Sequence, residues 1–92
     1  MTNFLREYTT GDKKLYDRIA QQERLIISTS EMVWVEAKKQ GKTLEKLANA
    51  IERSKGYLSQ LLGGDRNMTL RTLSDLAYSL DMEVRVNFEP KI

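Results

Sequence analysis

The stretch TLEKLANAIERSKGYLSQLL, residues 43–62, decides the fold of this chain. Its apolar residues recur at the spacing of one buried helix face, first over residues 44–51 and again over residues 58–62. The first set comprises Leu44, Leu47, Ala48 and Ile51, and the second set comprises Leu58, Leu61 and Leu62. Between the two sets, Ser54 is suited to an N-cap because its hydroxyl can accept a backbone N–H of the following turn. We therefore predict two short amphipathic helices joined by a tight turn.

Two interpretations of this helix pair stay open. Ala48 lies where two helices that cross steeply need a small side chain to let their backbones approach. One interpretation is an αα-hairpin within an ordinary helical bundle, and the other is a helix-turn-helix whose second helix enters the major groove of DNA. Both interpretations place the chain among mainly α folds, as a small helical bundle.

Composition limits the chemistry available to the chain. The 92 residues, 40% of them hydrophobic, allow one compact domain with a small core. The chain has no cysteine and no histidine, which excludes thiolate chemistry and removes the commonest metal ligand and general base. No apolar run reaches the roughly 18 residues of a bilayer crossing, and residues 1–10 lack the apolar core of a secretory signal. We expect a cytoplasmic protein that is not an enzyme and holds no metal or other cofactor.

Positive charge gathers in the middle of the chain although the net charge is only +2. Residues 38–66 contain seven basic residues against three acidic ones, an excess of four that leaves the rest of the chain two units acidic. The seven are Lys38, Lys39, Lys42, Lys46, Arg53, Lys55 and Arg66. Such a region suits a polyanion, and an ordinary solvated helix face has the same composition.

A helix is predicted near the N-terminus. Thr9 and Asp12 form a loose capping box, after which apolar residues recur at helical spacing to about Ile27. Residues 25–27 are apolar on every side, so we expect this end of the helix to be buried.

A second helix is predicted directly after the first. Ser28 and Glu31 stand at the spacing of a further capping box, which predicts a break and a new helix over about residues 30–40. Trp34 is expected in the core of the domain, and Gly41 is the expected left-handed C-cap.

One more helix and a strand are predicted after the central pair. Thr69 caps a helix that runs to Leu80, whose inward residues are Leu70, Leu73, Leu76, Ala77 and Leu80. Residues 82–88 alternate apolar and polar side chains, which is typical of a half-buried strand. A lone strand leaves its backbone donors and acceptors unpaired. The alternatives are therefore a solitary extended tail and a homodimer in which this segment pairs with itself, antiparallel, across a two-fold axis. The dimer is preferred, with Glu83 and Arg85 able to pair across strands; its residues are Met82, Val84, Arg85, Val86 and Phe88.

The chain from about Glu31 to Leu80 resembles the Cro/C1-type (XRE) helix-turn-helix family. The matching segments are TLEKLA at 43–48, SKGYLSQL at 54–61 and GDRNMTLRTL at 64–73. The resemblance implies a lambda-repressor-like domain. Glu52 stands where the family has a glycine, so either Glu52 is left-handed at a cost of about 1–2 kcal/mol or the turn is reshaped. The terminal strand, in place of the family's fifth helix, is similar to that of HigA-like and HipB-like antitoxins.

The resemblance also implies how DNA is contacted. The second helix of the motif lies in the major groove with its N-terminal residues toward the base edges. The implied base contacts are Lys55, Gly56, Tyr57, Ser59 and Gln60. The implied phosphate contacts are Lys42, Thr43, Lys46, Arg53, Arg66 and Asn67. Gln60 can bind an adenine edge through two hydrogen bonds, and Lys55 can reach guanine acceptors; each residue is equally typical of a plain solvent-facing helix.

The resemblance divides the chain into a helical extension (1–29), a DNA-binding domain (30–81) and a dimerisation strand with its tail (82–92). We expect a transcriptional repressor that binds a near-palindromic operator in double-stranded DNA as a homodimer. An antitoxin function is favoured, with residues 15–27 or the segment Phe4-Leu5-Tyr8 offered to a toxin. A free-standing phage or bacterial repressor and a protein-interaction bundle are the alternatives.

Overall fold

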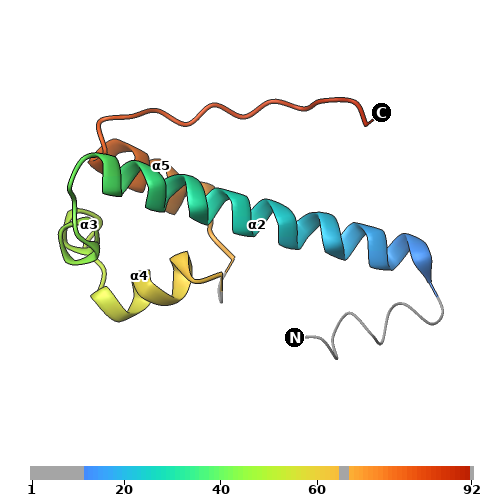
Figure 1. The fold of residues 1–92 in the computed structure, drawn as a ribbon, viewed down its shortest axis with the longest axis horizontal. Coiled ribbons are helices and arrows are strands. Elements are labelled where there is room, and N and C mark those ends of the chain that lie inside the picture. Colours follow the sequence, from blue (N-terminus) through green and yellow to red (C-terminus); the bar gives the residue numbers. More distant parts are fainter. Residues whose placement is uncertain (1–11, 65–66, 92) are drawn as a thin grey trace.

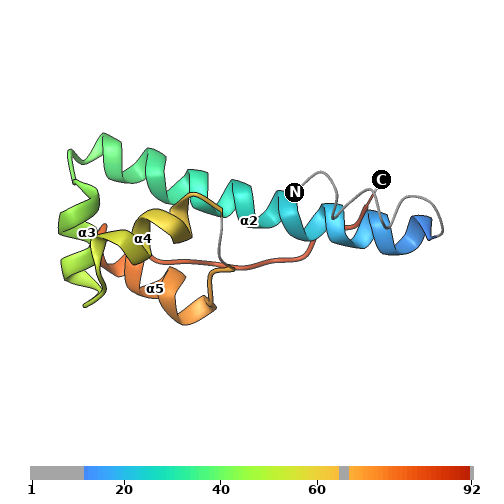
Figure 2. The ribbon, with the colours of Figure 1, turned by 90° about the horizontal axis from the view of Figure 1, so that it is seen from below.

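The chain folds into a small bundle of helices. The computed structural model describes residues 12–64 and 67–91, and within them lie α2 (Lys13–Lys39), α3 (Leu44–Ala50), α4 (Lys55–Leu62) and α5 (Leu70–Ser79) (Figure 1). Helix α4 packs against α3 and α2, and α3 packs against α5. The N-terminal half of α2 projects beyond the other three helices (Figures 1 and 2). The mainly helical architecture predicted from the sequence is confirmed.

Helix α2 is continuous through the point where a break was predicted. The prediction of a capping box at Ser28 and Glu31 is wrong, because both serines of this segment have other partners. The Ser28 hydroxyl donates to the Leu25 carbonyl one turn back, at 3.2 Å, and Ser30 is buried against α4. The helix begins at Lys13 and is N-capped by Asp12, whose carboxylate accepts the Leu15 N–H at 3.0 Å. Thr9 lies outside the described residues.

The face that α2 turns toward the bundle differs from the predicted one. Its buried stripe runs through Ser30, Val33 and Ala37 at spacings of three and four residues. Leu25 and Ile27 lie off this stripe and are 66% and 50% exposed, whereas Ile26 is half-buried. The prediction that residues 25–27 are buried is therefore wrong for Leu25 and Ile27. The same holds for Trp34, which is exposed rather than in the core.

The core is built mainly from leucines of α3, α4 and α5. Four leucines are fully buried, and the smaller Val33, Ala37 and Ala48 complete the contact between helices. The four are Leu47, Leu58, Leu61 and Leu76. The two short amphipathic helices and their inward faces are thus as predicted. Leu70, however, is 72% exposed, because it is the first residue of α5 and lies beyond the edge of the core.

Each of the four described helices has a left-handed residue after its C-cap, and for α4 this residue is Gly64 (φ 85°). After the other three helices the left-handed positions are Gly41 (φ 65°), Glu52 (φ 57°) and Asp81 (φ 58°). In each case the following N–H bonds back to a carbonyl in the last helical turn, as in a Schellman motif. These bonds are Lys42 to Ala37 (2.9 Å), Arg53 to Ala48 (2.9 Å) and Met82 to Ala77 (2.8 Å). The Gly41 cap is confirmed, and Glu52 takes the first of its two predicted alternatives.

The three later helices start at hydroxyl N-caps. Thr43, Ser54 and Thr69 accept the backbone N–H three residues further on, at 3.2, 3.0 and 3.1 Å. The N-caps predicted for Ser54 and Thr69 are confirmed.

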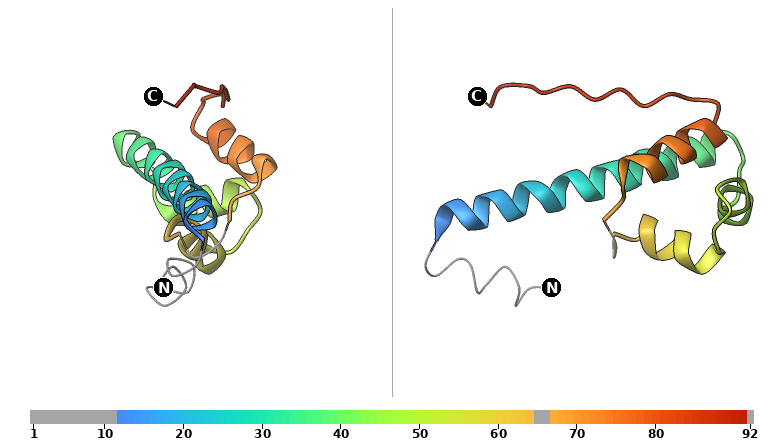
Figure 3. Two further views of the ribbon diagram at one scale, coloured as in Figure 1. Left: turned by 90° about the vertical axis from the view of Figure 1, so that its right-hand side faces the viewer. Right: turned by 180° about the vertical axis from the view of Figure 1, so that it is seen from behind.

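The segment after α5 is extended but is not a strand of any sheet among the described residues. The backbone of residues 83–91 makes no hydrogen bond to another described residue. The segment runs along α2 and α5 on the side opposite α4 (Figures 1 and 3). The predicted strand is therefore not formed in the single chain, since a ladder needs a second strand.

Replacing Glu52 with glycine tests the strain in the turn between α3 and α4. Glu52→Gly removes the roughly 1–2 kcal/mol cost of a left-handed side-chain-bearing residue, and the greater freedom of glycine in the unfolded chain offsets about 0.4–1 kcal/mol of this. We expect the free energy of unfolding in urea to rise by about 0.5–1 kcal/mol. The control Ala50→Gly, at a right-handed position of α3, should lower it by about 1 kcal/mol. Equal destabilisation by both changes would contradict the prediction.

Candidate nucleic-acid interface

The outer face of α4 is polar and accessible. Lys55, Gly56, Ser59 and Gln60 are exposed, and Tyr57 is half-buried at the edge of this face. The opposite face holds the buried leucines of the helix. Because the two faces belong to one helix of eight residues, about two turns, the packing of the leucines determines where the polar residues point. All five predicted base contacts are thus on α4, four of them exposed.

Gly56 leaves the start of this face open. A Cβ built at Gly56 would meet nothing within 4 Å, and the residue does not have a positive φ. Neither internal packing nor backbone conformation therefore requires glycine here. A partner approaching from outside would come closer to the α4 backbone at this position than at any side-chain-bearing residue.

Arg53 and Tyr57 form a contact across the start of α4. The Arg53 guanidinium carbon lies 5.2 Å from the centroid of the Tyr57 ring, a cation–π arrangement worth about 0.5–1 kcal/mol at an exposed site. Tyr57 also packs against the core. The ring is therefore held from two sides, and the positive charge of Arg53 is held beside the first turn of α4.

The residues predicted to contact phosphates fall into three groups. Thr43, Lys46, Arg53 and Asn67 are exposed. Lys42 is half-buried, and its ammonium donates to the Ser79 carbonyl at 2.5 Å, where it caps the C-terminal end of α5. Arg66 lies outside the described residues.

The positively charged Lys46 and Lys55 beside this face form no ion pairs within the described chain. There, no carboxylate lies within 4.0 Å of the ammonium groups of Lys46 and Lys55; the ion pairs found are Lys39–Glu36 and Arg85–Glu83, on other elements. The charges of Lys46 and Lys55 therefore face solvent and are available to a polyanion.

Two further polar side chains position the helices and were not predicted. Ser30 is 4% exposed and its hydroxyl donates to the Leu61 carbonyl in the last turn of α4, at 3.4 Å. The Gln40 amide donates to the Leu80 carbonyl at 2.8 Å. Both bonds reach carbonyls near helix C-termini. The Leu61 carbonyl also accepts the Gly64 N–H at 3.3 Å, so the Ser30 hydroxyl is its second donor. For Ser30 a sequence signal existed, since it continues the stripe of Val33 and Ala37.

Residues 12–64 and 67–91 contain no group of three or more His, Cys, Asp or Glu side chains placed to hold a metal ion. None of their helices has both the length and the apolar character that a bilayer crossing requires.

Comparison of the chain with protein-family models, with curated proteins and with solved structures found no match in any of the three.

Removing the Ser30 hydroxyl tests how much its hydrogen bond to α4 contributes to stability. Ser30→Ala removes the side-chain hydrogen bond to the Leu61 carbonyl, which keeps the Gly64 N–H as a donor, and we expect the free energy of unfolding to fall by about 1 kcal/mol, the net contribution of one hydrogen bond. Ser28→Ala is the matched control, because Ser28 is an exposed serine on the same helix whose hydroxyl bonds only within its own turn; its change should stay within about 0.5 kcal/mol. Urea denaturation followed by circular dichroism measures both. Indistinguishable losses would show that Ser30 contributes nothing specific.

Proposed function

We propose that this protein is a sequence-specific DNA-binding transcriptional repressor, in which α3 and α4 act as a helix-turn-helix and α4 enters the major groove. One observation carries the proposal: the outer face of α4 is exposed, polar and open at Gly56, while its inner face is fixed by the core. A major groove admits one α-helix presented in this way. The resemblance of the sequence to XRE-type domains supports the same function.

Base recognition is assigned to the exposed residues of α4. Gln60 presents an amide that can donate to and accept from adenine, and Lys55 presents donors for the N7 and O6 acceptors of guanine. Ser59 can contact either kind of base edge, and Gly56 lets the helix backbone approach closely. Tyr57, which is held by Arg53, contributes its ring edge or hydroxyl to a thymine methyl or a phosphate.

Phosphate contacts are assigned to the residues that flank α4. Thr43, Lys46, Arg53 and Asn67 are exposed, and Arg66 is added on the basis of the sequence. These contacts fix the orientation of the protein on the duplex without reading its sequence. Lys42 is assigned a structural role instead, because its ammonium caps α5.

One short helix makes few base contacts, so a single copy is expected to bind weakly. A homodimer would present two α4 helices to half-sites about 34 Å apart, one turn of DNA, on a near-palindromic operator. The extended segment after α5 supports this arrangement, since its backbone groups are unpaired within the described chain. Its dimerisation residues are Met82, Val84, Arg85, Val86 and Phe88.

The antitoxin function is the more specific form of the proposal. Leu25 and Ile27 of α2 are exposed, which gives a toxin an apolar surface outside the polar face of α4. Co-expression with the product of an adjacent reading frame tests this form, and a stable complex that neutralises a growth defect is the expected result. A free-standing repressor would need no such partner.

Gln60→Ala tests base recognition. Selection of bound duplexes from a random pool first identifies the operator and its symmetry. On that operator we expect Gln60→Ala to lower the affinity at least about tenfold and to remove the preference at one base pair per half-site, because a bidentate contact discriminates by about 1–3 kcal/mol. Gln22→Ala, an exposed glutamine on the projecting half of α2, is the control and should bind normally. Identical titrations of the two variants on every sequence would exclude α4 as the reading helix.

Lys46→Ala tests a phosphate contact. Loss of one such contact should weaken binding by a similar factor on all sequences and reduce the slope of log K against log salt by about one unit. Lys14→Ala removes the same charge from the distant end of α2 and should leave the slope unchanged. Anisotropy titrations at several salt concentrations measure it, and equal slopes for both variants would remove Lys46 from the interface.

A further inference from the structure

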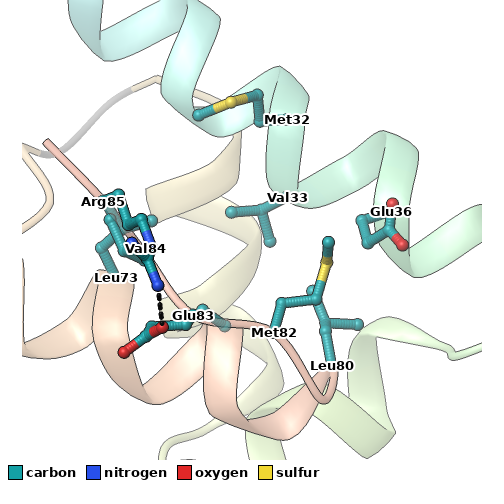
Figure 4. A pocket seen from close by; sticks show the side chains of 10 residues that line it. Met32, Val33, Glu36, Leu73, Leu80, Met82, Glu83, Val84 and Arg85 are labelled. Carbon is teal, nitrogen blue, oxygen red and sulfur yellow. Dashed lines mark hydrogen bonds and ion pairs between the residues drawn. The ribbon is translucent and has the colours of Figure 1, made fainter. Parts of the chain in front are cut away.

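An apolar groove lies between α2, α5 and the C-terminal segment, residues 82–91. Its deeper part has a volume of about 340 Å³, and a second hollow of about 320 Å³ continues along the same segment. Aliphatic side chains and the thioethers of two methionines make up most of the deeper wall (Figure 4). These apolar residues include Met32, Val33, Leu73, Leu80, Met82 and Val84.

Two methionines of the groove are accessible to solvent. Met32 and Met82 are 63% and 50% exposed, and they line the groove from different elements, Met32 from α2 and Met82 from the start of the C-terminal segment (Figure 4). Met68, in the second hollow, is half-buried and packs against the core; Met1 lies outside the described residues. The chain has no cysteine, so methionine thioethers are its only sulfur atoms. Because an oxidant must reach the sulfur, we expect Met32 and Met82 to react before Met68.

Side-chain contacts hold the C-terminal segment on the groove. Its backbone bonds to the bundle at Met82, whose N–H donates to the Ala77 carbonyl at 2.8 Å. Beyond Met82 the backbone makes no hydrogen bond to another described residue. The ion pair of Glu83 with Arg85, at 3.3 Å, joins two residues of the segment itself and does not attach it to α2 or α5. Val84 is half-buried, whereas the described residues after it are exposed. The position of the segment therefore depends on a few apolar contacts along the groove.

We propose that Met32 and Met82 form an oxidation site, and that their conversion to methionine sulfoxide releases the C-terminal segment from α2 and α5. The oxidant is hydrogen peroxide. The thioether sulfur attacks one peroxide oxygen, and an S–O bond forms as the O–O bond breaks. The proton of the transferred oxygen passes to the departing hydroxide, which leaves as water. Each sulfur loses the two electrons that the peroxide gains.

Oxidation would place a polar S=O group on two walls of an apolar groove. The sulfoxide oxygen is a hydrogen-bond acceptor, and removing it from water without a donor costs free energy. The aliphatic walls supply no donor. Among the described residues that line the deeper part, Arg85 alone carries side-chain N–H groups, and it is already bonded to Glu83. The oxidised side chains are therefore better solvated when the segment has moved away from the groove.

Peptide mass spectrometry measures the rate of oxidation at each methionine. After brief exposure of the full-length protein to hydrogen peroxide, we expect Met32 and Met82 to form sulfoxide at least about fivefold faster than Met68. The control is the same treatment in urea, where the fold no longer protects Met68 and the three rates should become equal. Equal rates in the folded protein, or the fastest reaction at Met68, would overturn the proposal.

Tryptic cleavage after Arg85 measures release of the segment, because a protease acts on the population of chains that have left their support. We expect peroxide treatment to speed this cleavage about five- to tenfold. Treatment of the oxidised protein with the two stereospecific methionine sulfoxide reductases and a dithiol reductant should reverse the increase, since both sulfoxide epimers are then reduced. Cleavage that stays constant or slows after both methionines are oxidised would contradict the release.

Leucine substitutions identify the sulfur atoms responsible. Met32→Leu combined with Met82→Leu removes both thioethers and keeps apolar side chains of similar volume, so cleavage after Arg85 should no longer respond to peroxide. Met68→Leu is the matched control and should respond as the unmodified protein does, with circular dichroism showing that each variant is folded. A double variant that still responds would refute the assignment to Met32 and Met82.

None of these measurements involves DNA. Failure of the oxidation-dependent release would leave the proposed function untouched. A protein that ignores every duplex but releases its C-terminal segment on oxidation would refute the proposed function and uphold the oxidation site.

Discussion

The burial of Leu58 and Leu61 is the constraint on which the rest of the structure depends. Helix α4 has eight residues, and a helix of this length has no appreciable stability alone in water. Its existence and its direction therefore come from packing against α3 and α2, whose Leu47, Val33 and Ala37 are buried in the same core. Full burial of each leucine contributes about 1.5–3 kcal/mol. The exposed polar face has its orientation only because these apolar contacts fix the helix about its own axis.

The connections between α2, α3 and α4 repeat one local solution. Each connection consists of four residues with the same four roles in order. The first is the C-cap, the second is left-handed, the third donates its N–H back to the preceding helix, and the fourth is the hydroxyl N-cap of the next helix. The two connections are Gln40-Gly41-Lys42-Thr43 and Ile51-Glu52-Arg53-Ser54. The first follows local preference, because glycine is left-handed at little cost. The second has the same geometry with Glu52, at a cost that packing must offset. The turn before α4 therefore forms because core packing stabilises it, whereas the turn before α3 is also favoured by the conformational preference of Gly41.

The sequence predicted well what depends on local signals and buried periodicity. The spacing of Leu58, Leu61 and Leu62 determined which residues of α4 are exposed, and hydroxyl side chains marked the helix starts. Errors arose where a distant contact decides the outcome. Ser30 satisfies a carbonyl of Leu61, 31 positions away, so the expected break in α2 does not occur. The ammonium of Lys42 likewise binds a carbonyl of α5 instead of facing solvent. The alternation over residues 82–88 predicts an extended backbone, but a sheet also needs a second strand, which this part of the sequence does not supply.

The positions of the two candidate interaction surfaces have a consequence for regulation. The outer face of α4 and the C-terminal segment lie on opposite sides of α2 and α5, so a partner on one does not block the other sterically. Any coupling between them must pass through α2 and α5. There Ser30 contacts α4, and Val33 faces both the core and the groove that lies between α2, α5 and the C-terminal segment. Helix α2 therefore connects the two surfaces through two residues of one stripe. A partner that bent or displaced α2 would disturb α4 and the groove together, without touching DNA.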